Sequence, residues 1–276
     1  MRGTPAHRAP AAPRISPTAA GGAAALSVAF VVLVQTLLLG AGDVGSARAA
    51  TGQGTSVAAA SQGAGGGVRP AGVRGDGPLK LALVGDSYLN GKGAPEGKGM
   101  GAVLTRRLDA DLANFAEGGT GWADDGPDAP ATGSYDEHAE EVLASRPDLV
   151  VVAGGYNDHA AINKQLLTYD DVATNARSLL TRLSKAQGVR TVVFGPFWVN
   201  GEPPMSLLLM RDVLQTEAER AGLEWVDPIA EGWINGDRRD KTGNAAVFIR
   251  RDRIHPTPQG HRYFARRMAK AIRTLG

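Results

Sequence analysis

A serine, a histidine and an aspartate carry most of the chemical information in this sequence. Ser87 follows an apolar run and is preceded by Gly85-Asp86, and His255 stands three residues after Asp252. A serine hydroxyl is a weak nucleophile until a neighbouring base takes its proton, and His255 is the natural base. Asp252 could accept the other ring N–H, fix the imidazole tautomer and stabilise the imidazolium. These residue types predict acyl transfer with Ser87 as nucleophile.

Acyl transfer also needs hydrogen-bond donors for the oxyanion of its tetrahedral intermediate. The backbone N–H of Ser87 is one such donor, and the pair Gly118-Gly119 offers a second, because a substrate can approach a backbone closely at glycine. The third is the side-chain amide of Asn157, which donates without carrying a charge that titrates. These groups predict an oxyanion hole.

Other histidines compete with His255 for the role of base: His138, His159 and His261. None of the three has an aspartate three residues earlier and a proline directly after it. His255 is therefore the preferred base. Asp86, although it neighbours Ser87, is interpreted as a turn or capping residue rather than as a catalytic acid.

The sequence argues against two other kinds of site, a phosphate-binding loop and a zinc site. Residues 85–93 resemble a phosphate-binding loop, but the spacing to Gly91-Lys92 is one residue too long and Gly93 replaces the Ser or Thr that would hold magnesium. The chain has no cysteine and no two-histidine helical pair, so it lacks the usual ligand patterns of zinc. We expect no metal and no organic cofactor.

Predicted strands and predicted helices alternate in the part of the chain that carries these residues. The strand candidates are Leu79–Val84, Asn114–Ala116, Asp148–Ala153, Arg190–Phe194 and Glu224–Val226. Between them lie helical patterns, such as the apolar stripe within residues 172–183, and Thr257-Pro258 predicts that a closing helix begins just after His255. Alternation of this kind predicts a parallel sheet covered on both faces, with its ligand site at the carboxyl ends of the strands.

The order of these groups resembles that of the GDSL/SGNH hydrolase family. Four blocks carry the resemblance: Gly85-Asp86-Ser87, Gly119, Gly155-x-Asn157-Asp158 and Asp252-x-x-His255-Pro256. Gly119 is preferred to Gly118 because it stands five residues after Asn114, as the family's glycine follows its asparagine. The resemblance covers the chain from about Leu79 to the C-terminus.

This resemblance implies a three-layer α/β sandwich with a parallel, flavodoxin-like sheet. It also implies hydrolysis of carboxylic esters through an acyl-serine intermediate. Ser87, Asp252 and His255 match the catalytic positions, and Ser87, Gly119 and Asn157 match the oxyanion hole.

The first third of the chain predicts export rather than a folded domain. Basic residues precede an apolar run from Ala23 to Leu39, which is followed by the small-residue pattern Ser46-Ala47-Arg48-Ala49. We expect residues 1–49 to be a signal peptide or an uncleaved membrane anchor, residues 50–78 a flexible Ala/Gly/Ser linker, and residues 79–276 the hydrolase domain. The protein is then secreted or held at the membrane.

Although the net charge is only +2, basic residues are concentrated between Arg250 and Arg273. We interpret this cluster as a solvated helix face and expect no nucleic-acid partner. We expect the protein to be a monomer.

Aromatic residues near the strand ends could form a platform for a sugar ring or an acyl chain: Tyr88, Trp122, Tyr156, Phe197 and Trp198. Trp122 lies in the long loop 118–134, which could overhang Ser87. The expected substrate is a small-molecule, lipid or polysaccharide ester. A non-catalytic binding module at the cell surface and an acyltransferase with the same serine are the alternatives.

Overall fold

The computed structural model describes residues 77–276. The predicted signal peptide or anchor at 1–49, and all of the predicted linker except residues 77 and 78, lie outside the described residues. None of the helices in the described part combines the length and the hydropathy needed to span a bilayer.

Five parallel strands form one sheet in the order β2-β1-β3-β4-β5. They are β1 (Leu79–Gly85), β2 (Ala110–Ala116), β3 (Leu149–Ala153), β4 (Arg190–Phe194) and β5 (Glu224–Val226). This is the flavodoxin-like strand order, and it confirms the predicted α/β fold. Only β2 differs much from its predicted range, because it is an edge strand whose exposed residues Asp111 and Leu112 lack a clear apolar alternation.

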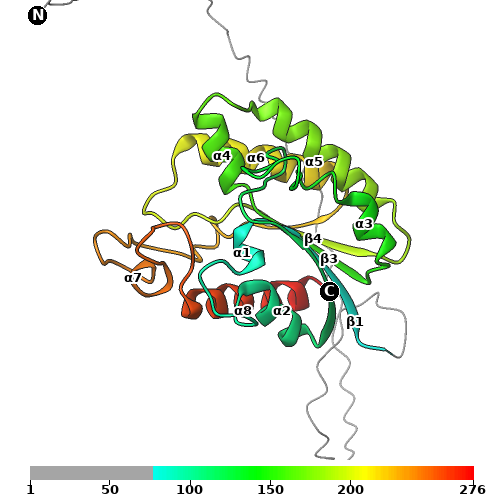
Figure 1. Ribbon diagram of the computed structural model, residues 1–276, viewed down its shortest axis with the longest axis horizontal. Coiled ribbons are helices and arrows are strands. Elements are labelled where there is room, and N and C mark those ends of the chain that lie inside the picture. Colours follow the sequence, from blue (N-terminus) through cyan, green and yellow to red (C-terminus); the bar gives the residue numbers. More distant parts are fainter. Residues whose placement is uncertain (1–76) are drawn as a thin grey trace, which may run out of the picture. The chain divides into compact units, whose positions relative to one another are not determined.

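Helices cover both faces of the sheet (Figure 1). One layer holds α1 (Ser87–Asn90), α2 (Met100–Leu108), α7 (Ala245–Phe248) and α8 (Pro258–Leu275). The other holds α3 (Ala139–Ala144), α4 (Tyr156–Asn163), α5 (Tyr169–Ser184) and α6 (Met205–Arg220). Each layer buries its own apolar cluster against the sheet, so the described chain forms a three-layer sandwich with two cores.

Local sequence accounts for the principal elements. All five residues of β3 are buried, as expected for a central strand covered on both faces. In α5 the predicted apolar stripe is buried, and Thr168 and Asp171 form a capping box at its start. At the start of α8 the Thr257 side chain accepts a hydrogen bond from the N–H of Gly260, and Pro258 occupies the first turn, which confirms the predicted helix start.

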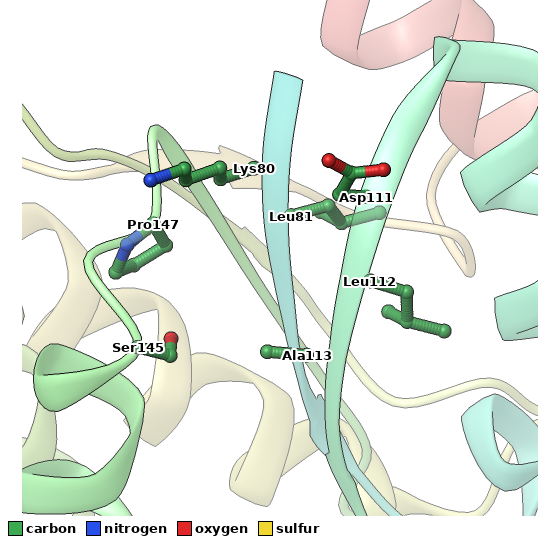
Figure 2. Close-up of a pocket in the computed structure, with 7 residues that line it drawn as sticks. All are labelled: Lys80, Leu81, Asp111, Leu112, Ala113, Ser145 and Pro147. Carbon is green, nitrogen blue, oxygen red and sulfur yellow. The ribbon is translucent and has the colours of Figure 1, made fainter. Parts of the chain in front are cut away.

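A cavity of about 190 Å³ lies near the amino ends of β1 and β2 (Figure 2). It is lined by Lys80, Leu81, Asp111, Leu112, Ala113, Ser145 and Pro147. In a sheet of this kind ligands bind at the opposite edge, where the strand order reverses between β1 and β3. The candidate site must therefore be sought at the carboxyl ends of these two strands.

Candidate active site

Ser87 lies directly after the carboxyl end of β1, as the first residue of α1. The turn is tight because a side chain at Gly85 would place its Cβ only 2.5 Å from the carbonyl oxygen of Ala153 on the neighbouring strand. Asp86 caps α1 by accepting a hydrogen bond from the N–H of Tyr88 at 2.8 Å. This confirms the interpretation of Asp86 as a capping residue, and it leaves Ser87 at the strand end.

The structure brings Ser87, His255 and Asp252 into one hydrogen-bonded chain. The Ser87 Oγ lies 3.1 Å from His255 Nε2, and His255 Nδ1 lies 3.0 Å from Asp252 Oδ2, although 168 residues separate the serine from the histidine. With Nδ1 protonated toward the carboxylate, Nε2 is free to accept the serine proton. The spacing is that of a nucleophile, a base and an orienting acid.

A compact turn holds the histidine and the aspartate in this arrangement. The other carboxylate oxygen of Asp252 accepts the backbone N–H groups of Ile254 and His255, each at 3.0 Å. Although partial burial raises the pKa of Asp252, these two hydrogen bonds and the contact with the His255 ring lower it below its usual value. Asp252 therefore stays ionised and can stabilise an imidazolium.

The turn is also tied to α1 and to the residue that follows α7. The Tyr88 hydroxyl donates a hydrogen bond to the Ile254 carbonyl, which ties the turn to α1. An antiparallel bridge joins Ile249 to Pro256, on the way into α8. The base therefore has little freedom to move away from the nucleophile.

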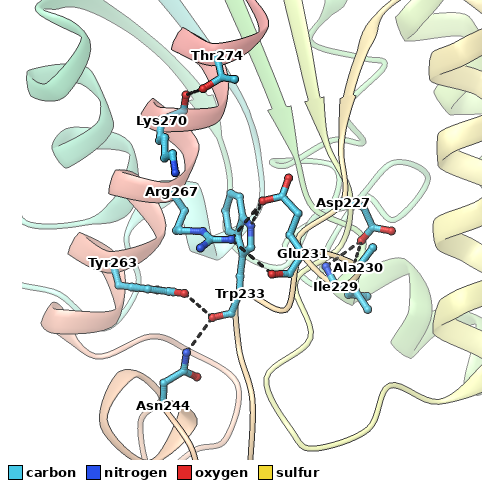
Figure 3. A network of polar contacts seen from close by, with 10 residues as sticks. All are labelled: Asp227, Ile229, Ala230, Glu231, Trp233, Asn244, Tyr263, Arg267, Lys270 and Thr274. Carbon is cyan, nitrogen blue, oxygen red and sulfur yellow. Dashed lines mark hydrogen bonds and ion pairs between the residues drawn. The ribbon is translucent and has the colours of Figure 1, made fainter.

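A second set of contacts holds the segment that leads to this turn (Figure 3). Residues 227–244 follow β5 and return to α8, where the Trp233 carbonyl accepts hydrogen bonds from the Tyr263 hydroxyl at 2.7 Å and from the Asn244 amide at 3.0 Å. Arg267 pairs with Glu231 at 3.2 Å and lies over the Trp233 ring, 5.2 Å from its centroid. The segment is thus fastened to the helix that begins just after His255.

The segment that carries Gly118 and Gly119, the two glycines considered for the oxyanion hole, runs beside Ser87. A Cβ added to Gly118 would lie 3.9 Å from the Ser87 Cβ, so this segment passes beside the nucleophile. Gly119 has a φ of +94°, which favours glycine, and an added Cβ would lie 2.7 Å from Pro127. Asn157 donates from its side chain to the Thr120 carbonyl at 2.8 Å, in the same segment. The oxyanion roles of Gly119 and Asn157 stay predictions.

Asp158 is a site residue for which the sequence pattern predicts no separate role. Its carboxylate is fully buried and accepts the backbone N–H groups of Trp122 at 3.0 Å and Ala123 at 2.8 Å. A side chain at Gly121 would collide with this carboxylate, since its Cβ would lie 2.3 Å away. Asn157 and Asp158 together therefore hold the segment 120–123. The run Gly155-x-Asn157-Asp158 was the only available signal, and it does not say which backbone groups the carboxylate binds.

Three of the five aromatic residues predicted to form a substrate platform belong to the core instead: Trp122, Tyr88 and Phe197. Trp122 is fully buried, with its ring 5.4 Å from Tyr135, and Tyr88 is 2% exposed and stacked on Phe197 at 5.5 Å. Phe197 is itself buried. Their positions near strand ends suggested a platform, but side chains that pack inward from such loops reach the core rather than the substrate.

Tyr156 and Trp198 remain half-buried and stack on each other, with ring centroids 6.4 Å apart. Tyr156 lies next to Asn157. Burial is the main reason why its pKa is raised; the charge of Arg253 lowers the pKa and that of Asp252 raises it. These two rings can therefore form one wall beside the predicted catalytic groups. Their contact with substrate stays a prediction.

The competing histidines have other partners. His261 is buried, faces the N–H of Met100 through Nδ1 and the carbonyl of Lys92 through Nε2, and has its pKa lowered by burial to about 4. His159 contacts Ser206 and Asn163, and His138 lies near two glutamates. Of the histidines in residues 77–276, His255 is the one that contacts Ser87.

Within residues 77–276, no three His, Cys, Asp or Glu side chains gather in a way that could hold a metal ion.

Comparison with known proteins decides the family. Residues 83–263, which include the whole Ser87, Asp252 and His255 constellation, match the GDSL-like lipase/acylhydrolase family. The chain belongs to this family. It is therefore a GDSL/SGNH protein with carboxylic ester hydrolase activity.

Relatives of this GDSL/SGNH protein extend the likeness over the described domain. The GDSL lipase Rv0518 of Mycobacterium tuberculosis is 30% identical over 208 residues, which is 70% of this chain and 80% of the relative. The structure is similar to that of Axe2, an acetylxylan esterase from Geobacillus stearothermophilus, with a TM-score of 0.55 and 22% identity over 70% of this chain and 94% of the other. It is also similar to Est24, a carbohydrate acetylesterase from Sinorhizobium meliloti, with a TM-score of 0.55 and 16% identity over 72% and 100% of the two chains.

Proposed function

We propose that this GDSL/SGNH hydrolase cleaves short acyl or acetyl esters of carbohydrates or lipids through an acyl intermediate on Ser87. The observation that carries the proposal is the continuous hydrogen-bond chain from Ser87 through His255 to Asp252. It supplies an activated nucleophile and an oriented base in one place.

The first half of the reaction forms the acyl-enzyme. His255 Nε2 takes the Ser87 proton while Oγ attacks the ester carbonyl, and the carbonyl oxygen becomes an oxyanion. Donors from Ser87, Gly119 and Asn157 stabilise that charge. As the tetrahedral intermediate collapses, His255 gives its proton to the leaving alkoxide oxygen and the alcohol departs.

The second half returns the free enzyme. His255 removes a proton from water, the resulting hydroxide attacks the acyl carbon, and the Ser87 oxygen leaves and recovers its proton from His255. The carboxylic acid is released. Asp252 keeps its charge throughout and stabilises the imidazolium of each step.

The names of the relatives support the substrate class, since they include a lipase, an acetylxylan esterase and a carbohydrate acetylesterase. We propose that the domain acts outside the cytoplasm because of the basic, apolar and small-residue pattern in residues 1–49. Retention of the apolar segment would make it a membrane tether. A mature chain that begins near Ala50 would indicate cleavage, and an intact N-terminus in the membrane fraction would indicate an anchor.

The test is a chain-length series of 4-nitrophenyl esters, assayed beside an acetylated sugar and a phospholipid. We expect turnover that is fastest for short acyl groups and that a serine-directed fluorophosphonate abolishes by labelling Ser87. Transfer of the acyl group to an added sugar or lipid alcohol, with little free acid, would replace hydrolysis by acyl transfer. Binding without turnover of any ester would contradict the proposal.

A further inference from the structure

A basic cavity lies beside the predicted catalytic aspartate, in the part of the chain that contains α7 and the turn before α8. The segment 237–253 carries six Arg or Lys residues and three Asp residues. Three of these arginines and Asp252 line a cavity of about 410 Å³, together with Thr257 and apolar residues of α7. In Figure 1 this region projects beside the amino end of α8. We call it the arginine cavity, and its arginines are Arg238, Arg250 and Arg251.

The three arginines of the arginine cavity form no ion pair with any described carboxylate. Within residues 77–276, no ion pair or side-chain hydrogen bond joins any of its three guanidinium groups to another residue. Arg238 is the least favourably placed of the three, because its Nε is buried without a hydrogen-bond partner. A buried donor without an acceptor is unfavourable, and adjacent positive charges raise that cost.

Two of the three carboxylates in the segment 237–253 are already engaged, and the third, Asp240, is exposed and is not part of the cavity lining. Asp252, the one acidic residue that lines the cavity, accepts two backbone N–H groups and contacts the His255 ring. Asp237 lies 3.4 Å from Arg253 and accepts the N–H of Arg239. Arg250 and Arg251 are exposed and Arg238 is half-buried with only its Nε closed off, so the terminal N–H groups of all three side chains are open to an anion in the cavity. An anion from outside the protein would neutralise the charges of these arginines.

We propose that the arginine cavity binds a phosphate-type oxyanion. A guanidinium presents planar N–H donors that match the oxygens of a phosphate, and three such groups around one cavity are suited to an anion with several acceptor oxygens. The phosphate can come from two sources, namely a phosphate-bearing ester substrate or free inorganic phosphate. In either case the anion is held beside Asp252, within the turn that carries His255.

Calorimetric titration of the full chain with inorganic phosphate tests the site, with sodium chloride at matched ionic strength as the reference. We expect saturable binding that weakens at least tenfold in Arg238→Gln and severalfold in Arg251→Gln. Arg262→Gln is the matched control, because Arg262 is an exposed arginine of α8 outside the cavity. Absence of saturable binding, or an equal loss in the control variant, would overturn the proposal. The circular dichroism spectrum of each variant shows that it is folded.

Kinetics then distinguish the two sources. If the phosphate belongs to the substrate, inorganic phosphate and Arg238→Gln both raise KM for a phospholipid and leave KM for 4-nitrophenyl acetate unchanged. If free phosphate is an effector, it changes kcat for both esters by the same factor, and this change disappears in Arg238→Gln. These kinetic measurements rest on the proposed esterase function, whereas the binding measurement does not. Ser87→Ala protein without turnover should still bind phosphate as the wild type does.

Discussion

At the scale of single residues, the proposed mechanism depends on the contact between Ser87, the proposed nucleophile, and His255, which comes from a distant part of the chain. Ser87 is nearly buried at the end of β1, so its hydroxyl has few partners apart from the His255 ring. His255 owes its orientation to Asp252, whose two oxygens serve different purposes: one meets the ring and the other binds the backbone of the turn. A substitution at each of these positions should therefore have a different consequence.

Ser87→Ala and His255→Ala should each remove nearly all ester turnover, because either change leaves no activated nucleophile. Asp252→Asn should lower kcat by about 10⁴ and leave a measurable rate, since the base persists without its orienting charge. Asn157→Ala should lower kcat by about 10² to 10³ if its amide donates to the oxyanion. Steady-state kinetics and fluorophosphonate labelling measure these effects. Wild-type activity in Ser87→Ala would refute the mechanism.

Asp158→Ala should reduce kcat without a comparable change in KM. The substitution leaves two backbone N–H groups, those of Trp122 and Ala123, without acceptors, each at a cost of about 1 to 3 kcal/mol. The segment beside Ser87 then loses its fixed geometry, and donors that act in the transition state affect kcat most. The control is Asp124→Ala, which removes a half-buried carboxylate bonded to Gly126 in the same loop. Lower stability with an unchanged kcat in the folded fraction would restrict Asp158 to a structural role.

At the scale of elements, the turn that carries the base is held between two helices and a long segment. The segment 227–244 has little regular structure, and it is ordered by its contacts with α8 (Figure 3). These contacts meet at one backbone carbonyl, that of Trp233, and at the Arg267 side chain. The α8 helix thus serves two purposes, because it covers the sheet and it anchors the approach to His255.

Tyr263→Phe should destabilise the protein by about 1 kcal/mol, the typical contribution of one hydrogen bond, because it deletes the bond to the Trp233 carbonyl and keeps the ring packed on Phe248. Urea unfolding measures this change, and hydrogen exchange should show faster opening of residues 227–244. Thr274→Val, which removes an exposed hydroxyl contact at the end of α8, serves as the comparison and should leave that segment unchanged. Equal exchange rates in the two variants would show that the network does not order the segment.

At the scale of the whole molecule, two buried carboxyl groups link stability to pH. Burial raises the pKa of Asp86 to about 7, and the nearby Asp158 adds to the effect. Burial likewise raises the pKa of Asp158 to about 6. A raised pKa means that the folded chain holds the proton more tightly than the unfolded chain, so stability must fall as the pH rises from about 4 to about 7.

Asp86→Asn should remove much of this pH dependence. The amide oxygen can still cap α1 by accepting the Tyr88 N–H, but the group no longer ionises. At pH 8 the variant should be more stable than the wild type by up to a few kcal/mol, on the order of 1.4 kcal/mol for each pKa unit. At pH 4 the difference should be small. Urea unfolding between pH 4 and pH 8 checks this, and parallel curves for the two proteins would contradict it.

The sequence by itself predicted the parallel sheet, two of the helices that cover it and a set of residues that lie together in the fold. Apolar runs such as Leu149–Ala153 are strands wherever both faces are covered, and the stripe in α5 has the helical period, so local patterns sufficed for these elements. The Ser87, Asp252 and His255 set was also readable, because one short turn holds two of its members and the third follows a strand.

Only the tertiary structure decided where individual side chains point and which distant groups they contact. Whether Trp122 faces a substrate or the core, and which backbone groups a buried Asp158 binds, follow from the path of a loop that has no periodic pattern. The same holds for Arg238, which looks like any surface arginine in the sequence. Only the folded chain shows that its Nε is buried and that its side chain lines a cavity next to the turn that carries His255.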